Sequence, residues 1–233
     1  MISDWRGNTA IITAVTGNYD NPTYQPRIDD VDFIYFTDGK NQKDIPKPWN
    51  VAQLPEKDVD LDDRRRSKRP KLNPHSMPEL LQYKYVVWID GEIVIRNTEF
   101  LEKSFSYMKN GWVVSPHPDS VVENGRNCAY GEATIRPIKY KDEPLDEQCS
   151  FYRSEGFPEN YGLYACGFSV RDMSVEKVKD TGELWHQQNI TWSYQDQVSF
   201  PYCLWKTGFI PDKLPFTLYD NEWFSLNLHN KET

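Results

Sequence analysis

The chain has 233 residues, a net charge of −8, 38% hydrophobic residues and 14% aromatic residues. An aromatic content this high is atypical of disordered proteins, and the length suits one large α/β domain or two small ones. The acidic balance argues against a general binder of nucleic acid or of anionic membranes, and no apolar stretch approaches the roughly 18 residues that a membrane-spanning helix needs.

The N-terminus and the cysteines bear on the cellular compartment. Residues 1–6 contain no apolar core of the kind found in secretory signals, and they lead directly into a strand-like segment. The cysteines are scattered, without CxxC pairs or short regular spacing, at Cys128, Cys149, Cys166 and Cys203. We expect reduced thiols rather than disulfides or a structural zinc site. The default location is therefore a reducing cytoplasm, unless the chain has been trimmed.

Apolar, β-branched runs predict strands in the first part of the chain. They cover Thr9–Val15, Val31–Phe36, Trp49–Leu54 and Tyr85–Ile89, and a further apolar run resumes at Ile93–Ile95. The run Tyr85–Ile89 is the strongest of these predictions, and it stops abruptly at Asp90. Before it, a highly charged stretch reaches from Asp58 to Lys71, and Pro78–Tyr83 predicts a short helix.

Helices and strands alternate in the second part. Helices are predicted over Phe100–Lys109, Ser174–Gln188 and Gln195–Trp205, and strands over Gly111–Ser115 and Leu163–Val170. Between residues 121 and 159 the pattern weakens into polar helix and loop, and the tail from Phe216 has no regular period. This alternation predicts an α/β sandwich with a mostly parallel sheet.

Two carboxylates flank a glycine at the end of the most apolar strand. Asp90 and Glu92 point the same way if the chain stays extended, because successive strand residues alternate faces. Gly91 lets other atoms approach the backbone closely. Two hard oxygen ligands at the carboxyl end of a strand suit Mg²⁺ or Mn²⁺ bound to a diphosphate. The alternative is a plain β-turn, which the Asp-Gly dipeptide favours by itself.

The charged stretch is acidic first and basic afterwards. The basic run Arg64–Lys71 can bind phosphate through bidentate arginine or point-charge lysine. Composition alone favours a solvated loop, neutralised by the preceding acidic residues Asp58, Asp60, Asp62 and Asp63. A nuclear-localisation or nucleic-acid patch is a third interpretation, and the acidic net charge disfavours it.

Asp196 opens an apolar helix after a segment that contains Trp185 and Trp192. Aspartate at a helix N-terminus is most often a cap, whereas an aspartate directed into an aromatic pocket can act as a general base. The histidines are scattered without HxH or HExxH spacing, so none of them signals a metal site by itself.

Several short motifs follow one another in a fixed order. They are Ile11-Ile12-Thr13-Ala14, Gly17-x-Tyr19-Asp20, Tyr35-Phe36-Thr37-Asp38, Lys68-x-x-Lys71-Leu72-x-Pro74-His75, Trp88-Ile89-Asp90-Gly91, Ser115-Pro116-His117-Pro118, Cys128-x-Tyr130-x-Glu132-Ala133, Leu163-Tyr164 and Gln195-Asp196-Gln197-x-Ser199-Phe200. This set resembles the glycosyltransferase-like family long catalogued as domain of unknown function 616, whose plant members are linked to pectin and mucilage polysaccharides. The resemblance extends from about Thr9 to His229, and its most specific part is the block of the lysine and Trp-Ile-Asp-Gly motifs.

The resemblance implies a GT-A fold, in which a Rossmann-like nucleotide half is joined to an acceptor half. It implies one domain over residues 1–233, with the nucleotide-sugar half at about 1–95 and the acceptor half and tail at 96–233. The implied activity is metal-dependent transfer of a sugar from a nucleotide-sugar, UDP- or GDP-linked, to a glycan or other hydroxyl acceptor. Mn²⁺ or Mg²⁺ is the implied cofactor, and neither nucleic acid nor a membrane segment is expected.

Carried over residue by residue, the resemblance also implies the site. The donor site would consist of Thr13, Ala14, Thr16, Tyr19, Asp38, Lys68, Lys71 and His75. The metal ligands would be Asp90, Glu92 and His229, where Glu92 departs from the aspartate of the family's metal motif. Asp196 would be the catalytic residue that faces the acceptor hydroxyl. Acceptor-side candidates are His117, Arg126, Tyr130, Glu132 and Trp185.

Two other functions stay open on the sequence. A catalytically inactive nucleotide- or sugar-binding module could use the same fold, and the departure at Glu92 keeps this alternative in play. A nucleic-acid-binding protein could use Arg64–Lys71, in which case its binding would depend steeply on salt.

Overall fold

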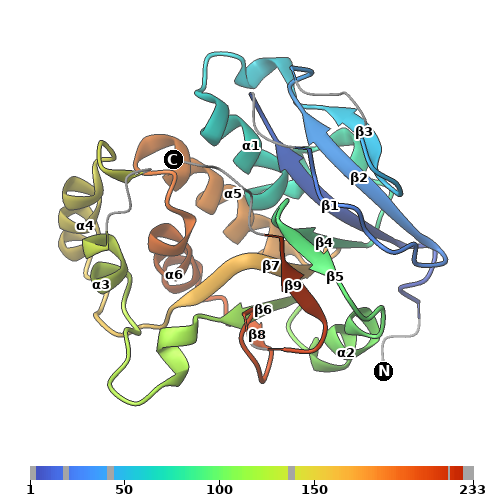
Figure 1. Ribbon diagram of the computed structural model, residues 1–233. Coiled ribbons are helices and arrows are strands. Elements are labelled where there is room, and N and C mark those ends of the chain that lie inside the picture. Colours follow the sequence, from blue (N-terminus) through green and yellow to red (C-terminus); the bar gives the residue numbers. More distant parts are fainter. Residues whose placement is uncertain (1–3, 18–20, 41–44, 136–139, 220, 228–233) are drawn as a thin grey trace.

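Figure 1 shows a computed structural model of the protein, which describes residues 4–17, 21–40, 45–135, 140–219 and 221–227. In this part of the chain, seven strands form one sheet in the order β3-β2-β1-β4-β7-β6-β8. The strands are β1 (Thr9–Val15), β2 (Val31–Thr37), β3 (Asn50–Gln53), β4 (Tyr85–Ile89), β6 (Trp112–Pro116), β7 (Tyr164–Asp172) and β8 (Asp212–Lys213). Strand β7 is antiparallel to both of its neighbours, and the other pairs are parallel. The sheet is therefore mostly parallel, as predicted.

A second, smaller sheet pairs β5 (Ile93–Ile95) with β9 (Phe224–Leu226) in antiparallel orientation. Strand β5 forms from the apolar run at Ile93–Ile95, whereas the sequence shows no regular period for the tail that contains β9. A three-residue strand is too short to produce a period, and its hydrogen-bond partner lies far away in sequence. The pairing brings the C-terminal part of the chain next to the segment that follows β4.

Helices cover both faces of the main sheet. The helices are α1 (Asp63–Leu72), α2 (Phe100–Tyr107), α3 (Ala129–Thr134), α4 (Leu145–Ser154), α5 (Glu176–Thr191) and α6 (Asp196–Thr207). Single turns of 3₁₀ helix occupy Glu56–Asp58, Pro74–Ser76, Pro78–Leu80 and Pro118–Val121. Helix α1 packs on β1 and β2, α5 packs on α1, and α6 packs on α5 and β7 (Figure 1).

The basic run is a helix and not the solvated loop that composition favours. Asp62 is the N-cap of α1, and its carboxylate accepts hydrogen bonds from the backbone N–H groups of Arg64 and Arg65, both at 3.0 Å. Arg69 forms an ion pair with the buried Asp58, so part of the expected neutralisation by the preceding acidic residues does occur. A cap, an acidic first turn and tertiary partners together outweigh the low apolar content of this segment.

Side chains alternate between the two faces of the sheet, as strand geometry requires. Ile11 and Val87 belong to the apolar cluster on one face, which includes Phe105 of α2. Ile12 and Trp88 belong to the cluster on the opposite face. Strands buried on both faces read as continuous apolar runs, which is why the sequence predicted β1, β2 and β4 well.

Two further findings concern the helices and the cysteines. No helix in the described ranges is both long and apolar enough to cross a membrane. The four cysteines all lie in the described ranges and none of them forms a disulfide, in agreement with the expected free thiols.

The burial of His186 on α5 can be tested through the pH dependence of the protein's stability. It is 4% exposed, and burial lowers its pKa to about 4, with a smaller contribution from Arg69. An unfolded histidine takes up its proton near pH 6.5, so acidification toward pH 4.5 favours the unfolded state by about 2 kcal/mol through this group. In His186→Gln, we expect the loss of stability between pH 7 and pH 4.5 to be smaller than in the wild type by that amount.

Urea unfolding of both proteins at the two pH values measures this difference. Comparing each protein with itself at pH 7 and pH 4.5 cancels any change in packing caused by the substitution. An identical pH dependence in wild type and variant would contradict the assignment.

Candidate functional site

Segments that follow β1 and β2 meet the start of α1 at the carboxyl edge of the parallel strands, where α/β sheets bind ligands. The Thr16 hydroxyl donates a hydrogen bond to the backbone oxygen of Asp63 at 2.5 Å, and the Gly17 N–H donates to Asp38 Oδ2 at 3.1 Å. Gly17 has a φ of +67°, a left-handed backbone conformation that favours glycine. The structure thus brings the expected donor residues Thr16 and Asp38 together.

Four charged side chains form an ion-paired group between α1, α6 and the end of β4, which we call the lysine–aspartate cluster (Lys68, Lys71, Asp90 and Asp196). Asp196 Oδ2 lies 2.9 Å from Lys68 Nζ and 2.6 Å from Lys71 Nζ. Lys71 Nζ also lies 3.1 Å from Asp90 Oδ1, so this ammonium group bridges two carboxylates. The side chains of Lys71 and Asp196 are only 3% and 6% exposed, whereas that of Asp90 is 37% exposed. The cluster therefore meets solvent at Asp90.

Charge pairing in the cluster outweighs burial for two of its groups. Burial alone would raise the pKa of Asp196, but the ammonium groups of Lys68 and Lys71 hold that pKa well below its ordinary value. Burial opposes the charged form of Lys71, but Asp196 and Asp90 together keep its pKa above the usual range. For Lys68, burial is the larger effect and lowers its pKa, and the attraction of Asp196 offsets part of it. Asp196 is thus an ionised carboxylate at neutral pH.

Asp196 does not act as a helix cap. It is the first residue of α6, and the N-cap residue Gln195 makes no capping hydrogen bond through its side chain. The carboxylate of Asp196 contacts the two ammonium groups instead. Its place at the positive end of α6 further favours the ionised form.

The chain does not stay extended after Asp90, so the condition under which Asp90 and Glu92 would point the same way is not met. The Ile93 N–H donates to the backbone oxygen of Asp90 at 2.9 Å, so residues 90–93 form a turn. The Asp-Gly dipeptide produces the turn that it favours by itself. The backbone oxygen of Glu92 accepts a hydrogen bond from the Asn227 N–H, next to β9. His229, the third expected metal ligand, lies outside the described residues.

Asp90 can supply one oxygen ligand to a divalent cation, but the protein groups around it do not form a complete ligand set. Its Oδ1 accepts hydrogen bonds from Trp88 Nε1 at 2.7 Å and from Lys71 Nζ, whereas Oδ2 makes no hydrogen bond or ion pair to the described residues. A Cβ at position 167 would lie 3.2 Å from Oδ2, so Gly167 leaves room beside it. The described residues contain no group of three or more His, Cys, Asp or Glu side chains able to hold a metal. An ion here would take its other ligands from phosphate and water, as Mg²⁺ commonly does.

Two of the expected donor residues, Thr13 and Ala14, lie on β1. Thr13 is next to the turn at residues 90–93, and Ala14 is partly buried and packs against the cluster that contains Trp88. The Thr13 hydroxyl is fully buried without a hydrogen-bond partner among the described residues, and it would lie 3.8 Å from a Cβ at Gly91. Tyr19, another expected donor residue, lies outside the described residues.

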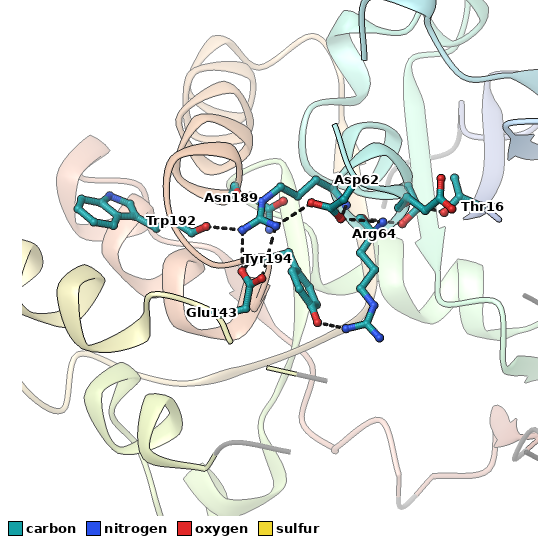
Figure 2. Close-up of polar contacts among 10 residues, drawn as sticks. Thr16, Asp62, Arg64, Glu143, Asn189, Trp192 and Tyr194 are labelled. Carbon is teal, nitrogen blue, oxygen red and sulfur yellow. Dashed lines mark hydrogen bonds and ion pairs between the residues drawn. The ribbon is translucent and has the colours of Figure 1, made fainter. Parts of the chain in front are cut away.

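The arginines of α1 are held by protein groups and are not freely solvated. Arg65 donates to Glu143 Oε2 and to the backbone oxygen of Trp192, both at 2.6 Å, and it forms an ion pair with Asp62 at 2.7 Å. Figure 2 shows how these contacts join the start of α1 to the segment after α5. Arg64 contacts the Tyr194 hydroxyl, as Figure 2 also shows. These contacts fix α1 relative to the second half of the chain.

Three of the acceptor-side candidates, Glu132, Arg126 and His117, are linked by hydrogen bonds and ion pairs to Gln195, the residue before Asp196. Glu132 is buried and its Oε1 accepts a hydrogen bond from Gln195 Nε2 at 3.1 Å. Arg126 forms ion pairs with Glu132 at 2.8 Å and with Asp119 at 3.0 Å. His117 Nδ1 accepts from the Asp119 N–H at 3.2 Å, and burial lowers the pKa of His117.

Three other expected site residues, His75, Trp185 and Tyr130, are not exposed beside the lysine–aspartate cluster. His75 Nε2 bonds the backbone oxygen of Met173, whose N–H donates to Lys84 at the amino end of β4, whereas Asp90 follows the carboxyl end. Trp185 is 3% exposed, and its Nε1 donates to the backbone oxygen of Asp196. Tyr130 is buried, and its hydroxyl donates to the backbone oxygen of Phe157. Trp185 is therefore a buried residue that holds the start of α6 through this hydrogen bond.

Arg171 on β7 is a positioning residue that the sequence did not reveal. It is 2% exposed, and its guanidinium donates to the backbone oxygens of Lys71 at 2.6 Å and Leu72 at 3.0 Å. Burial lowers its pKa to about 9. A Cβ at Gly182 of α5 would lie 2.7 Å from the same Leu72 oxygen, so α5 also packs closely here. A single arginine in an apolar strand has no spacing pattern that would indicate such a role. The contact of Trp88 with Asp90 could have been inferred from the sequence, because Trp88 lies two residues before Asp90 on the same face of the strand.

The sheet and its flanking helices have the architecture of a Rossmann-like GT-A fold. Residues 37–226 match the family described as the TOD1/MUCI70 glycosyltransferase-like domain, and the chain belongs to this family. No curated protein matches the chain in a sequence search.

Arg171 gives a test of how α1 is held. In Arg171→Leu, the two carbonyl groups at the end of α1 lose charge-assisted donors, so we expect a loss of about 3 kcal/mol in the free energy of unfolding. Urea unfolding at pH 7 measures it. Arg27→Leu is the matched control, because the Arg27 side chain is exposed and makes no hydrogen bond or ion pair to the described residues. Equal stability of the two variants would contradict the anchoring role.

Proposed function

We propose that the protein transfers a sugar from a nucleotide-sugar donor to a hydroxyl acceptor, with the donor diphosphate bound at the lysine–aspartate cluster. The observation that carries the proposal is the pair of lysines directed at one edge of the parallel strands, beside the partly exposed Asp90. The family match supports a glycosyltransferase-type function.

The leaving group of such a reaction is a nucleoside diphosphate, on which negative charge accumulates as the bond to the sugar breaks. Ammonium groups already fixed in place stabilise this charge without reorganisation at the moment of reaction. Lys68 is 19% exposed in its side chain and is the more accessible of the two. We propose that Lys68 and Lys71 contact the diphosphate, and that Thr16 and Asp38 lie on the nucleotide side.

A divalent ion, Mn²⁺ or Mg²⁺, completes the proposal. Asp90 Oδ2 would hold it, with Glu92 as a further oxygen donor and His229 kept as a predicted ligand. When bound, the ion would supply additional positive charge to the diphosphate. The acceptor hydroxyl would approach from the side of Glu132, because Gln195 connects that residue to the start of α6. Aromatic side chains on this side would cover the apolar face of a sugar.

Binding of nucleoside diphosphates tests the proposal. We expect calorimetry to detect binding of UDP or GDP that Mn²⁺ strengthens, because the ion links the phosphates to Asp90. Asp90→Asn should abolish the Mn²⁺-dependent part of the affinity and leave the fold intact, and Glu92→Gln should have a milder effect. Asp180→Asn, an exposed change on α5, is the matched control. An unchanged Mn²⁺ effect in Asp90→Asn would refute the metal assignment, and the absence of binding by either nucleotide in the wild type would refute the donor assignment.

The lysines are tested separately from the arginines. Lys68→Ala and Lys71→Ala should each weaken UDP or GDP binding by about 1.5–3 kcal/mol, the range for a hydrogen bond to a charged group. Arg64→Ala should change it little, because the Arg64 guanidinium contacts Tyr194. Calorimetric titrations at a fixed salt concentration provide the comparison. Equal losses at all three positions would indicate a diffuse field of positive charge instead of direct contacts.

A further inference from the structure

One carboxylate oxygen serves both lysines of the cluster. Lys68 Nζ and Lys71 Nζ lie 2.9 Å and 2.6 Å from the same atom, Asp196 Oδ2. Lys68 and Lys71 are three residues apart on α1 and therefore project from one side of that helix. Two ammonium groups that are largely removed from water would repel each other without a shared counter-ion. Asp196, on a different helix, is the group that brings them together.

The second contact of Lys71 shows where the pair is directed. Lys71 Nζ reaches Asp90 Oδ1 at 3.1 Å, and Trp88 Nε1 donates to the same oxygen. Asp90 is the most exposed member of the cluster, so a phosphate bound beside it would meet ammonium groups already oriented toward it. The lysine side chains are otherwise flexible, and holding them in one geometry before binding reduces the entropy that binding costs.

A proton acceptor needs a different environment from the one around Asp196. A general base works best when its pKa lies near the working pH. Asp196 is instead neutralised by two cations, and its position at the first residue of α6 stabilises the ionised form further. Both features make the carboxylate a strong counter-ion and a weak proton acceptor.

We propose that Asp196 is a positioning residue, the shared counter-ion that aims Lys68 and Lys71 at the donor diphosphate, and that it is not the group that takes the proton of the acceptor. This inference rests on the proposed function, since it assumes that a nucleoside diphosphate binds at the cluster. It assigns the charge of the cluster to donor binding and leaves proton removal to another group or to the departing diphosphate.

The experiment measures donor affinity in the intact chain, with UDP and GDP in the presence of Mn²⁺ as probes. A base that acts on the acceptor does not touch the diphosphate, so its removal leaves the dissociation constant unchanged. A counter-ion of the two lysines acts on that constant directly. Asp196→Asn should therefore raise the dissociation constant at least tenfold, and Asp196→Glu, which keeps the charge on a longer side chain, should recover part of the loss. Asp212→Asn is the matched control, because Asp212 is a buried aspartate whose carboxylate, among the described residues, accepts hydrogen bonds only from the backbone N–H groups of Lys109 and Asn110.

The coupling between Asp196 and Lys68 is the specific readout. In a Lys68→Met background, Asp196→Asn should raise the dissociation constant by a clearly smaller factor than it does in the wild type, because one of the two groups that Asp196 aims is already gone. If Asp196→Asn fails to fold, the Asp196→Glu variant carries the test alone, with a weakened donor affinity as the expected result.

Two results would overturn the inference, and they differ from failure of the proposed function. An unchanged affinity in Asp196→Asn, or in Asp196→Glu where that variant carries the test alone, would contradict the counter-ion role, and a large loss of turnover in the same protein would identify a base. Equal factors for Asp196→Asn in the wild type and in the Lys68→Met background would remove the link to Lys68. Failure of the wild type to bind either nucleotide refutes the proposed function itself.

Discussion

The site depends on a buried carboxylate that neutralises two ammonium groups. Moving a charge out of water is costly, and an ion pair in the interior is tolerated only when partners compensate it closely. Breaking such a pair by removing one partner typically costs about 3–5 kcal/mol, because the remaining charge is left uncompensated. Asp196 must therefore stay close to Lys68 and Lys71, and this requirement fixes α6 against α1.

The scaffold holds α1 at both ends. At its start, Asp62 caps the helix and Arg65 ties it to Glu143 and Trp192 in the second half of the chain (Figure 2). At its end, Arg171 binds the carbonyl groups of Lys71 and Leu72 from the sheet. The lysines thus project from a rigid element, and rigidity of this kind is what lets fixed charges act on a reacting group without reorganisation.

Local signals in the sequence predict the strands β1–β4, β6 and β7 and the helices α2, α5 and α6. The apolar runs of β1, β2 and β4 are buried on both faces, and the turn at Asp90 follows from its Asp-Gly dipeptide. The helix α1 was missed because its residues are charged throughout, so that its stability comes from a cap and from partners distant in sequence such as Arg171. Strand β9 is defined only by its pairing with β5.

The sequence predicted which residues belong to the candidate site better than it predicted the contacts between them. The order of motifs placed Lys68, Lys71, Asp90 and Asp196 in one site, but it could not show that these residues pair with each other. The resemblance placed His75 beside the diphosphate, in one motif with Lys68 and Lys71. In the fold, the chain passes the end of α1 and carries His75 to the amino end of β4. Spacing in sequence alone contains no information about such a reversal.

A structure of the protein crystallised with UDP or GDP and Mn²⁺ tests the account most directly. We expect diphosphate oxygens within hydrogen-bond distance of Lys68 Nζ and Lys71 Nζ, an ion beside Asp90 Oδ2, and Asp196 still paired with the lysines. A nucleotide bound away from the cluster, for example in the hollow lined by Tyr24, Arg27 and Lys47 near the amino end of β2, would contradict it.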